Sequence, residues 1–226
     1  MTRKPPDIDF VLRRPFIQFS GDEILAVIKN QFLTKDVDIE IATLALDELK
    51  RRKKAKRITQ QAQKRFREAG IKPIPWLQSA RDSLKFLEPP KKKNHKGYLY
   101  VILKDGFKER KGFYVPYVGV SAKRPEVRFK EHKSGVRAGR GLEKRGIQLL
   151  RSLCWPGYKE NGKWKTVPYG NRERYLWESA LHICLQTTIP EVAGDVQFQL
   201  KDWPEDFQVG CREMLGAKTS KVIIYR

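Results

Sequence analysis

Two short tyrosine-rich stretches precede a segment that carries an arginine and a histidine four residues apart. The first stretch is Tyr98-Leu-Tyr-Val-Ile102, and the second is Tyr117-Val-Gly119. The spacing of Arg128 and His132 places both side chains on one face of a helix, and Glu178 follows in a later amphipathic segment. Phenol, imidazole and carboxylate groups can move protons or hold metal ions, and a guanidinium group binds phosphate oxygens in a bidentate fork. This set of groups suits chemistry on a phosphate.

In their order and spacing these residues resemble the GIY-YIG nuclease family, and the resemblance covers residues 97–190. It implies an endonuclease that hydrolyses DNA phosphodiester bonds with Mg²⁺ or Mn²⁺. It also implies that Glu178 holds the metal, Arg128 holds the scissile phosphate, and Tyr100 is the base or orients the attacking water. Tyr117 and His132 would assist in proton handling and positioning.

The sequence departs from the family pattern in three places. The first motif reads Tyr-Leu-Tyr rather than Gly-Ile-Tyr, and a long basic segment, 104–111, separates the two tyrosine motifs. Many family members carry an asparagine after the metal-binding helix, but residues 187–200 contain none. Gln186, Asp195 or Gln197 could take its place, or the role is vacant.

Each candidate residue also has a structural explanation. Tyrosines are common in strands, where they pack against the sheet. Arg128 and His132 could lie on a solvated helix face, and Glu178 belongs to a stripe with Arg174, spaced by four, that is typical of an exposed face. The joint order of these residues, rather than any one of them, favours the catalytic interpretation.

The chain is strongly basic. It has 226 residues, 47 Lys and Arg against 26 Asp and Glu, and a formal net charge of +21. Residues 1–96 hold 23 basic and 12 acidic residues, residues 97–190 hold 19 and 8, and residues 191–226 hold 5 and 6. Such an excess predicts a polyanionic partner, and we expect DNA, with RNA left open.

Several basic positions are candidates for contact with nucleic acid. The segment 50–57 is basic at seven of its eight positions, which also fits a nuclear-localisation signal or solvated charge. Basic loops of the second half add further cations. The candidates are Lys50, Arg51, Arg52, Lys53, Lys54, Lys56, Arg57, Lys123, Arg124, Arg137 and Arg140.

The elements that position these residues follow from the hydrophobic pattern. A capping box at Ser20 predicts a helix over 21–33, and a second, long helix is expected from about residue 35 through the basic segment to Gly70. After a proline-rich stretch the pattern changes to β-β-α-α-β-α. This order predicts an α+β domain with a small antiparallel three-stranded sheet flanked by helices, preceded by a mainly α-helical basic region. We expect a helix at 76–87, strands at 98–103 and 113–120 around a loop at 104–112, helices at 125–134 and 142–153, a strand at 164–169, a helix at 172–187, and tail elements at 196–200, 204–215 and 222–225.

These expectations divide the chain into four parts: a helical basic nucleic-acid-binding region (1–90), a linker (91–96), the nuclease-like core (97–190), and a C-terminal extension that completes or flanks the core (191–226). Three distant cysteines without a C-x-x-C pair fit a reducing cytoplasm. We expect no signal peptide, membrane span or membrane partner.

The predicted function is a metal-dependent endonuclease, with restriction-like, homing or repair roles all compatible. One alternative is a non-catalytic nucleic-acid-binding protein that uses the same fold as a docking module. Another is a basic ribosome- or RNA-associated protein, in which the candidate residues would not converge.

Overall fold

The computed structural model describes residues 14–83, 98–154, 159–160, 163–164 and 171–196. The chain divides into two compact units, residues 1–78 and 79–226. The division falls inside a short helix, α4 (Leu77–Ser83). The predicted linker at 91–96 and the tail elements beyond residue 196 lie outside the described residues.

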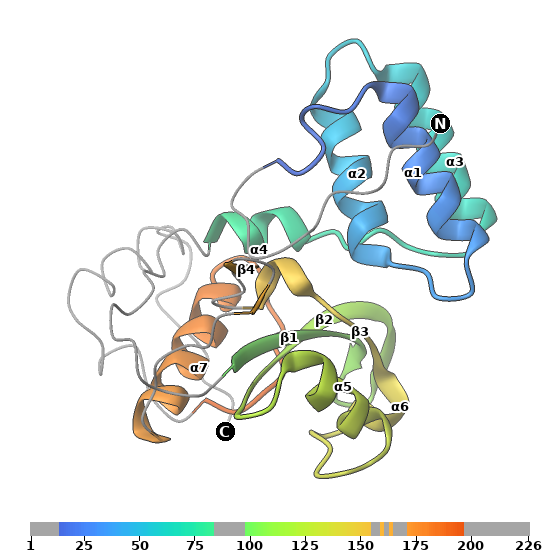
Figure 1. Cartoon of the computed structure of the whole chain (residues 1–226). Coiled ribbons are helices and arrows are strands. Elements are labelled where there is room, and N and C mark those ends of the chain that lie inside the picture. The colour runs from blue at the N-terminus through green and yellow to red at the C-terminus, as the bar shows by residue number, and fades with distance from the viewer. Residues whose placement is uncertain (1–13, 84–97, 155–158, 161–162, 165–170, 197–226) are drawn as a thin grey trace. The chain divides into compact units, whose positions relative to one another are not determined.

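The described part of the N-terminal unit is helical. α1 (Gly21–Leu33), α2 (Ile39–Arg51) and α3 (Lys56–Glu68) pack against one another (Figure 1). The predicted capping box is confirmed: Glu23 N–H donates to Ser20 Oγ at 3.2 Å, and Ser20 N–H donates to Glu23 Oε2 at 2.7 Å. Asp38 caps α2 by accepting from Ile41 N–H at 3.0 Å. Local caps therefore set where these two helices begin.

The prediction of one long helix through the basic segment is wrong, because the chain turns at residues 52–55 between α2 and α3. Arg52 has an extended backbone, and its guanidinium donates to the carbonyl oxygens of Phe16 and Phe19 and to Glu48. Burial alone would raise the pKa of Glu48, but hydrogen bonds from Arg14 and Arg52 lower it below its ordinary value. The bonds to Phe16 and Phe19, which are distant in sequence, hold Arg52 outside the helix at a point where the helical pattern of the sequence continues.

The second unit is built on a three-stranded antiparallel sheet in the order β2-β1-β3. β1 (Tyr98–Phe107) and β2 (Arg110–Ser121) form a hairpin, and β3 (Gly146–Leu149) pairs with the other edge of β1. The predicted loop at 104–112 is mostly strand. Gly106 (φ +74°) lies where the register of β1 and β2 shifts between Asp105 and Phe107, and a Cβ there would lie 1.9 Å from the Arg110 carbonyl oxygen.

The α+β class and the three-stranded antiparallel sheet flanked by helices are confirmed, but the third strand is not the predicted one. α5 (Pro125–Lys133) is followed by α6 (Leu142–Arg145), β3 and a 3-10 turn, η2 (Arg151–Leu153), in place of one helix over 142–153. The predicted strand 164–169 contributes only Trp164 within the described residues, in a separate pair of β4 (Lys159–Glu160) and β5 (Lys163–Trp164). α7 (Asn171–Gln186) packs against β2 and β1.

The chain after α7 returns along the free edge of β2. Val118 N–H donates to the Ala193 carbonyl, and Ala193 N–H donates to the Pro116 carbonyl, each at 2.8 Å. Pro116 has no N–H to donate, so it is tolerated at this edge. The start of the C-terminal extension is thus attached to the sheet. Among the described residues, no helix is long and apolar enough to span a membrane.

Candidate active site

The register of the hairpin brings the two candidate tyrosines to one face of the sheet. Tyr100 pairs with Gly119, and Ile102 pairs with Tyr117, so all four positions face the same side. Gly119 leaves room for the Tyr100 ring, because a Cβ there would lie 2.5 Å from the Tyr100 Cζ and Oη atoms. The glycine of the second motif therefore has a packing role.

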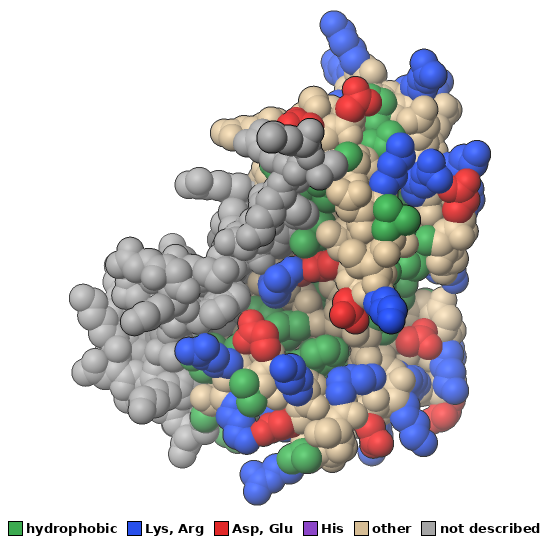
Figure 2. Space-filling view, turned by 45° about the vertical axis from the view of Figure 1, so that its right-hand side comes forward, with side chains coloured by type: hydrophobic (Ala, Val, Ile, Leu, Met, Phe, Trp, Pro, Cys, Tyr) green, Lys and Arg blue, Asp and Glu red, His purple; other side chains and the backbone are tan. Residues whose placement is uncertain are grey.

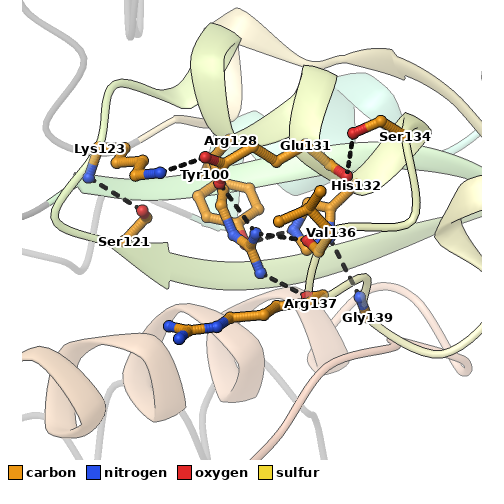
Figure 3. Close-up of polar contacts among 10 residues, drawn as sticks. All are labelled: Tyr100, Ser121, Lys123, Arg128, Glu131, His132, Ser134, Val136, Arg137 and Gly139. Atoms are coloured by element: carbon orange, nitrogen blue, oxygen red, sulfur yellow. Dashed lines mark hydrogen bonds and ion pairs between the residues drawn. The ribbon is translucent and has the colours of Figure 1, made fainter.

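His132 on α5 connects this face of the sheet to the loop that follows the helix. Its Nε2 lies 2.8 Å from Tyr100 Oη, and its Nδ1 accepts from Gly139 N–H at 3.1 Å (Figure 3). The ring also lies edge-on to Tyr117, with centroids 5.9 Å apart. Arg128, four residues earlier on α5, lies close enough for its charge to act on both His132 and Tyr100.

These contacts assign the tautomer of His132. Because Nδ1 accepts a hydrogen bond, the proton of the neutral ring lies on Nε2, and Nε2–H donates to the Tyr100 oxygen. Burial, followed by the charge of Arg128, lowers the pKa of His132 to about 4. His132 in this state cannot take a proton from Tyr100. It positions the phenol and would stabilise a developing phenolate.

Arg128 anchors the loop that follows α5. Its Nη1 donates to Glu131 and to the Val136 carbonyl, both at 3.1 Å, and its Nη2 donates to the Arg137 carbonyl at 2.6 Å (Figure 3). Arg128 also hydrogen-bonds to the Tyr100 side chain. A guanidinium carries five N–H donors, so these contacts still leave capacity for a phosphate oxygen. Arg128 is therefore part of the framework of the site as well as a candidate ligand for substrate.

Glu178, on α7, is buried and acts on both tyrosines. Burial raises the pKa of Tyr100, and the charges of Tyr117 and Glu178 add to this rise while Arg128 opposes it. Burial followed by the charges of Glu178 and Asp195 raises the pKa of Tyr117 to about 12, again against Arg128. All five predicted catalytic residues are thus linked by contact or by charge at one place.

Two of the three residues proposed to replace the missing asparagine are described, and they have different surroundings. Asp195 is exposed and its charge acts on Tyr117. Gln186 instead hydrogen-bonds to the buried His182, whose pKa burial lowers to about 4. Gln197 lies outside the described residues. Of the two described candidates, Asp195 is therefore the one whose charge acts on a candidate tyrosine, Tyr117.

Most of the predicted nucleic-acid-binding cations are exposed, but not all are free to bind a phosphate. Arg52 is engaged within the N-terminal unit, Lys50 pairs with Asp47 at 3.3 Å, and Lys123 pairs with Glu131. Arg137 is exposed with a left-handed backbone (φ +44°). The exposed positions among the predicted set are Lys50, Arg51, Lys53, Lys54, Lys56, Arg57, Lys123, Arg124, Arg137 and Arg140.

Sequence reasoning missed two residues that shape this site, Glu131 and Gly139. Glu131 accepts from Lys123 and Arg128, and these bonds lower its pKa. Gly139 approaches Tyr117 so closely that a Cβ would lie 2.4 Å from the phenol oxygen. The only sequence signal for Gly139 is the glycine-rich composition of residues 135–141.

The described residues contain no group of three or more His, Cys, Asp or Glu side chains arranged to hold a metal ion. A metal here would depend on one buried carboxylate, Glu178, together with waters and substrate oxygens. That ligand set suits Mg²⁺, which keeps several waters, and does not suit structural zinc.

Comparison with known proteins gives no relative: no family model, curated protein or solved structure matches this chain.

Proposed function

We propose that this protein is a metal-dependent endonuclease of GIY-YIG type that hydrolyses DNA phosphodiester bonds. The observation that carries the proposal is the convergence of Tyr100, Tyr117, Arg128 and His132 at one place, where the charge of the buried Glu178 acts on both tyrosines. These residues come from β1, β2, α5 and α7 and are up to 78 positions apart. If these residues were only solvated surface groups of a basic protein, we would not expect them to cluster at one place.

In the proposed reaction, water attacks phosphorus and the bond from phosphorus to one bridging oxygen breaks, which leaves a phosphate monoester and an alcohol. The Tyr100 hydroxyl accepts from His132 Nε2–H, so its own proton is directed elsewhere and can orient the attacking water. The remaining donors of Arg128 would hold a non-bridging oxygen and offset the charge that builds there. Tyr117, opposite Ile102 on the same face, would position the water or the leaving oxygen.

Glu178 would hold Mg²⁺ or Mn²⁺, which would supply charge stabilisation at the phosphate and raise the acidity of bound water. Burial, followed by neighbouring charges that include Glu178, raises the pKa of each phenol, so both stay protonated at neutral pH. A cation held by Glu178 would offset the contribution of that carboxylate. The two tyrosines would then act as protonated groups that orient the water and the leaving oxygen.

Plasmid cleavage with and without Mg²⁺ tests this proposal. Glu178→Gln keeps the shape of the side chain and removes its charge, and we expect the cleavage rate to fall by about 100-fold or more. Glu109→Gln is the matched control, because Glu109 is exposed at the turn of the β1–β2 hairpin. Unchanged cleavage by Glu178→Gln would contradict the proposal.

A second candidate, a non-catalytic nucleic-acid-binding protein, is favoured by one observation: Arg128 already donates to Glu131 on its own helix and to two carbonyls of the following loop. In that case wild-type protein would bind DNA but leave the plasmid intact with Mg²⁺ and with Mn²⁺. Binding without cleavage by the wild type therefore separates this candidate from the nuclease.

A further inference from the structure

We propose that α2, the turn 52–55 and α3 form a helix-turn-helix element whose second helix, α3, enters the major groove of duplex DNA. The inference rests on the proposed function only in taking DNA as the partner, and not on cleavage. It also moves the predicted contact surface from the continuous basic segment 50–57 to the outer face of α3.

The two helices differ in how much of their surface they bury. α2 is buried at ten of its thirteen positions, so it is the central helix of the unit. α3 buries only Ala62 and Phe66, and Phe66 packs edge-on against Phe32 with ring centroids 4.9 Å apart. A four-residue turn, 52–55, joins the two helices, as is typical of a helix-turn-helix.

The contacts of α3 follow one narrow stripe. Ile58, Ala62 and Phe66 recur at four-residue spacing, and Ile58 meets α1 where Gly21 leaves space, since a Cβ at Gly21 would lie 2.7 Å from Ile58 Cδ1. At 100° per residue the opposite side of the helix consists of Arg57, Gln60, Lys64 and Arg67. All four of these side chains are exposed. The packing of α3 thus fixes which face remains outside.

This outer face, Arg57, Gln60, Lys64 and Arg67, has the composition of a surface that reads DNA. α3 has five cations and a single carboxylate, Glu68, which pairs with Arg65 at 2.9 Å and with Lys64 at 3.6 Å. Both pairs are exposed and therefore weak, so Lys64 can exchange Glu68 for a phosphate. Figure 2 shows blue Lys and Arg side chains projecting from the surface of the molecule.

The dimensions of α3 suit the major groove. Arg57 and Lys64 lie two turns apart, about 10 Å along the axis, and the groove is about 12 Å wide and admits an α-helix. The flanking cations can reach phosphates on either side, and Gln60 between them can form a bidentate pair with adenine. The exposed turn residues Lys53 and Lys54 precede the helix and add positive charge at its start.

The test measures binding of the full chain to a fluorescent DNA duplex, without divalent metal, over a series of salt concentrations. The triple variant Arg57→Gln, Lys64→Gln, Arg67→Gln should bind at least about ten-fold more weakly. Its slope of log K against log salt should be shallower by about 2 to 3. The matched control removes three exposed charges elsewhere in the same unit, at Lys29, Lys35 and Lys72. An equal loss in the control, or an unchanged slope in the triple variant, would overturn the proposal.

Two competitions test the groove and the kind of nucleic acid. A major-groove dye should displace the wild-type protein from the duplex and a minor-groove dye should not. Duplex RNA of the same sequence should bind more weakly, because its major groove is too deep and narrow for side chains to read. Displacement by the minor-groove dye, or equal affinity for RNA, would overturn the assignment. Because no metal is present, these results do not depend on whether the protein cleaves DNA.

Discussion

At the scale of single residues, the site depends on the protonation state of one imidazole. Gly139 N–H fixes Nδ1 of His132 as an acceptor, so Nε2–H is committed to Tyr100. A histidine that accepts a proton from its neighbour would need the opposite arrangement. In the proposed reaction the role of His132 is therefore positioning, and the four-residue spacing of His132 and Arg128 in the sequence does not predict this role.

The lowered pKa of His132 predicts how stability depends on pH. An ordinary histidine has a pKa near 6.5, whereas His132 in the folded protein has a pKa of about 4. Between these values the unfolded chain binds a proton that the folded protein does not, so stability falls as pH drops from about 6.5 to 4. His132→Gln, which keeps an N–H donor for Tyr100, should reduce the slope of unfolding free energy against pH by up to about 1.4 kcal/mol per pH unit.

Chemical denaturation at several pH values measures this slope. His182→Gln is a useful parallel variant, because burial lowers the pKa of His182 to about 4 as well. The two effects should add in the double variant. If the slope of unfolding free energy against pH is the same in His132→Gln and in wild type, the pKa of His132 is not lowered by folding. His132 would then take up a proton in the folded protein over this range, which contradicts the assigned neutral tautomer.

At the scale of secondary-structure elements, the β1–β2 hairpin sets the geometry of the tyrosines. The Tyr100–Gly119 pair places a ring over a glycine, and no larger side chain fits there. Loss of this fit would move the Tyr100 hydroxyl away from His132.

Gly119→Ala tests the fit directly. The added methyl would overlap the Tyr100 ring, so we expect a loss of about 1 to 3 kcal/mol in unfolding free energy and weaker cleavage. Thermal melts and the cleavage assay measure both effects. Gly139→Ala provides a comparison, since its methyl would overlap Tyr117 rather than Tyr100. Wild-type stability and cleavage in Gly119→Ala would show that the pairing does not position the site.

Much of this architecture is predictable from local signals. The capping box at Ser20, the strand-forming residues around Tyr100, and the proline at the first position of α5 all lie where the sequence indicates. Four-residue spacing also predicts that Arg128 and His132 share a helix face. Because these signals act within a few residues, they predict the structure without knowledge of the rest of the chain.

The elements that were predicted wrongly depend on contacts between distant residues. α2 ends because the Arg52 guanidinium binds the carbonyls of Phe16 and Phe19. β3 forms because residues 146–149 complete the edge of β1, although Leu142–Leu153 has an apolar pattern that also suits a helix. Arg128 likewise anchors the following loop by donating to backbone carbonyls. Every residue has a carbonyl, so the residue types of the loop do not predict this contact.

At the scale of the whole molecule, the basic charge serves two separate proposed tasks. The outer face of α3 would hold duplex DNA, and the residues around Glu178 would cleave it. The two units are compact in themselves, so substitutions in one should leave the task of the other intact. This separation predicts different kinetic signatures for the two kinds of variant.

The Arg57, Lys64, Arg67 triple variant should require more DNA to reach its maximal rate. At saturating DNA its single-turnover cleavage rate should stay within about three-fold of wild type. The reason is that those residues would stabilise the bound substrate and the transition state equally. A large fall in the rate at saturation would mean that α3 takes part in the chemical step and that the two tasks are not separate.

The most direct test of the central claim is the single-turnover cleavage rate of Glu178→Gln at saturating DNA and Mg²⁺, measured beside its binding affinity. We predict affinity close to that of wild type and a rate reduced by about 100-fold or more, with Glu109→Gln unchanged in both. Wild-type cleavage by Glu178→Gln would contradict the claim that Tyr100, Tyr117, Arg128, His132 and Glu178 form a metal-dependent nuclease site.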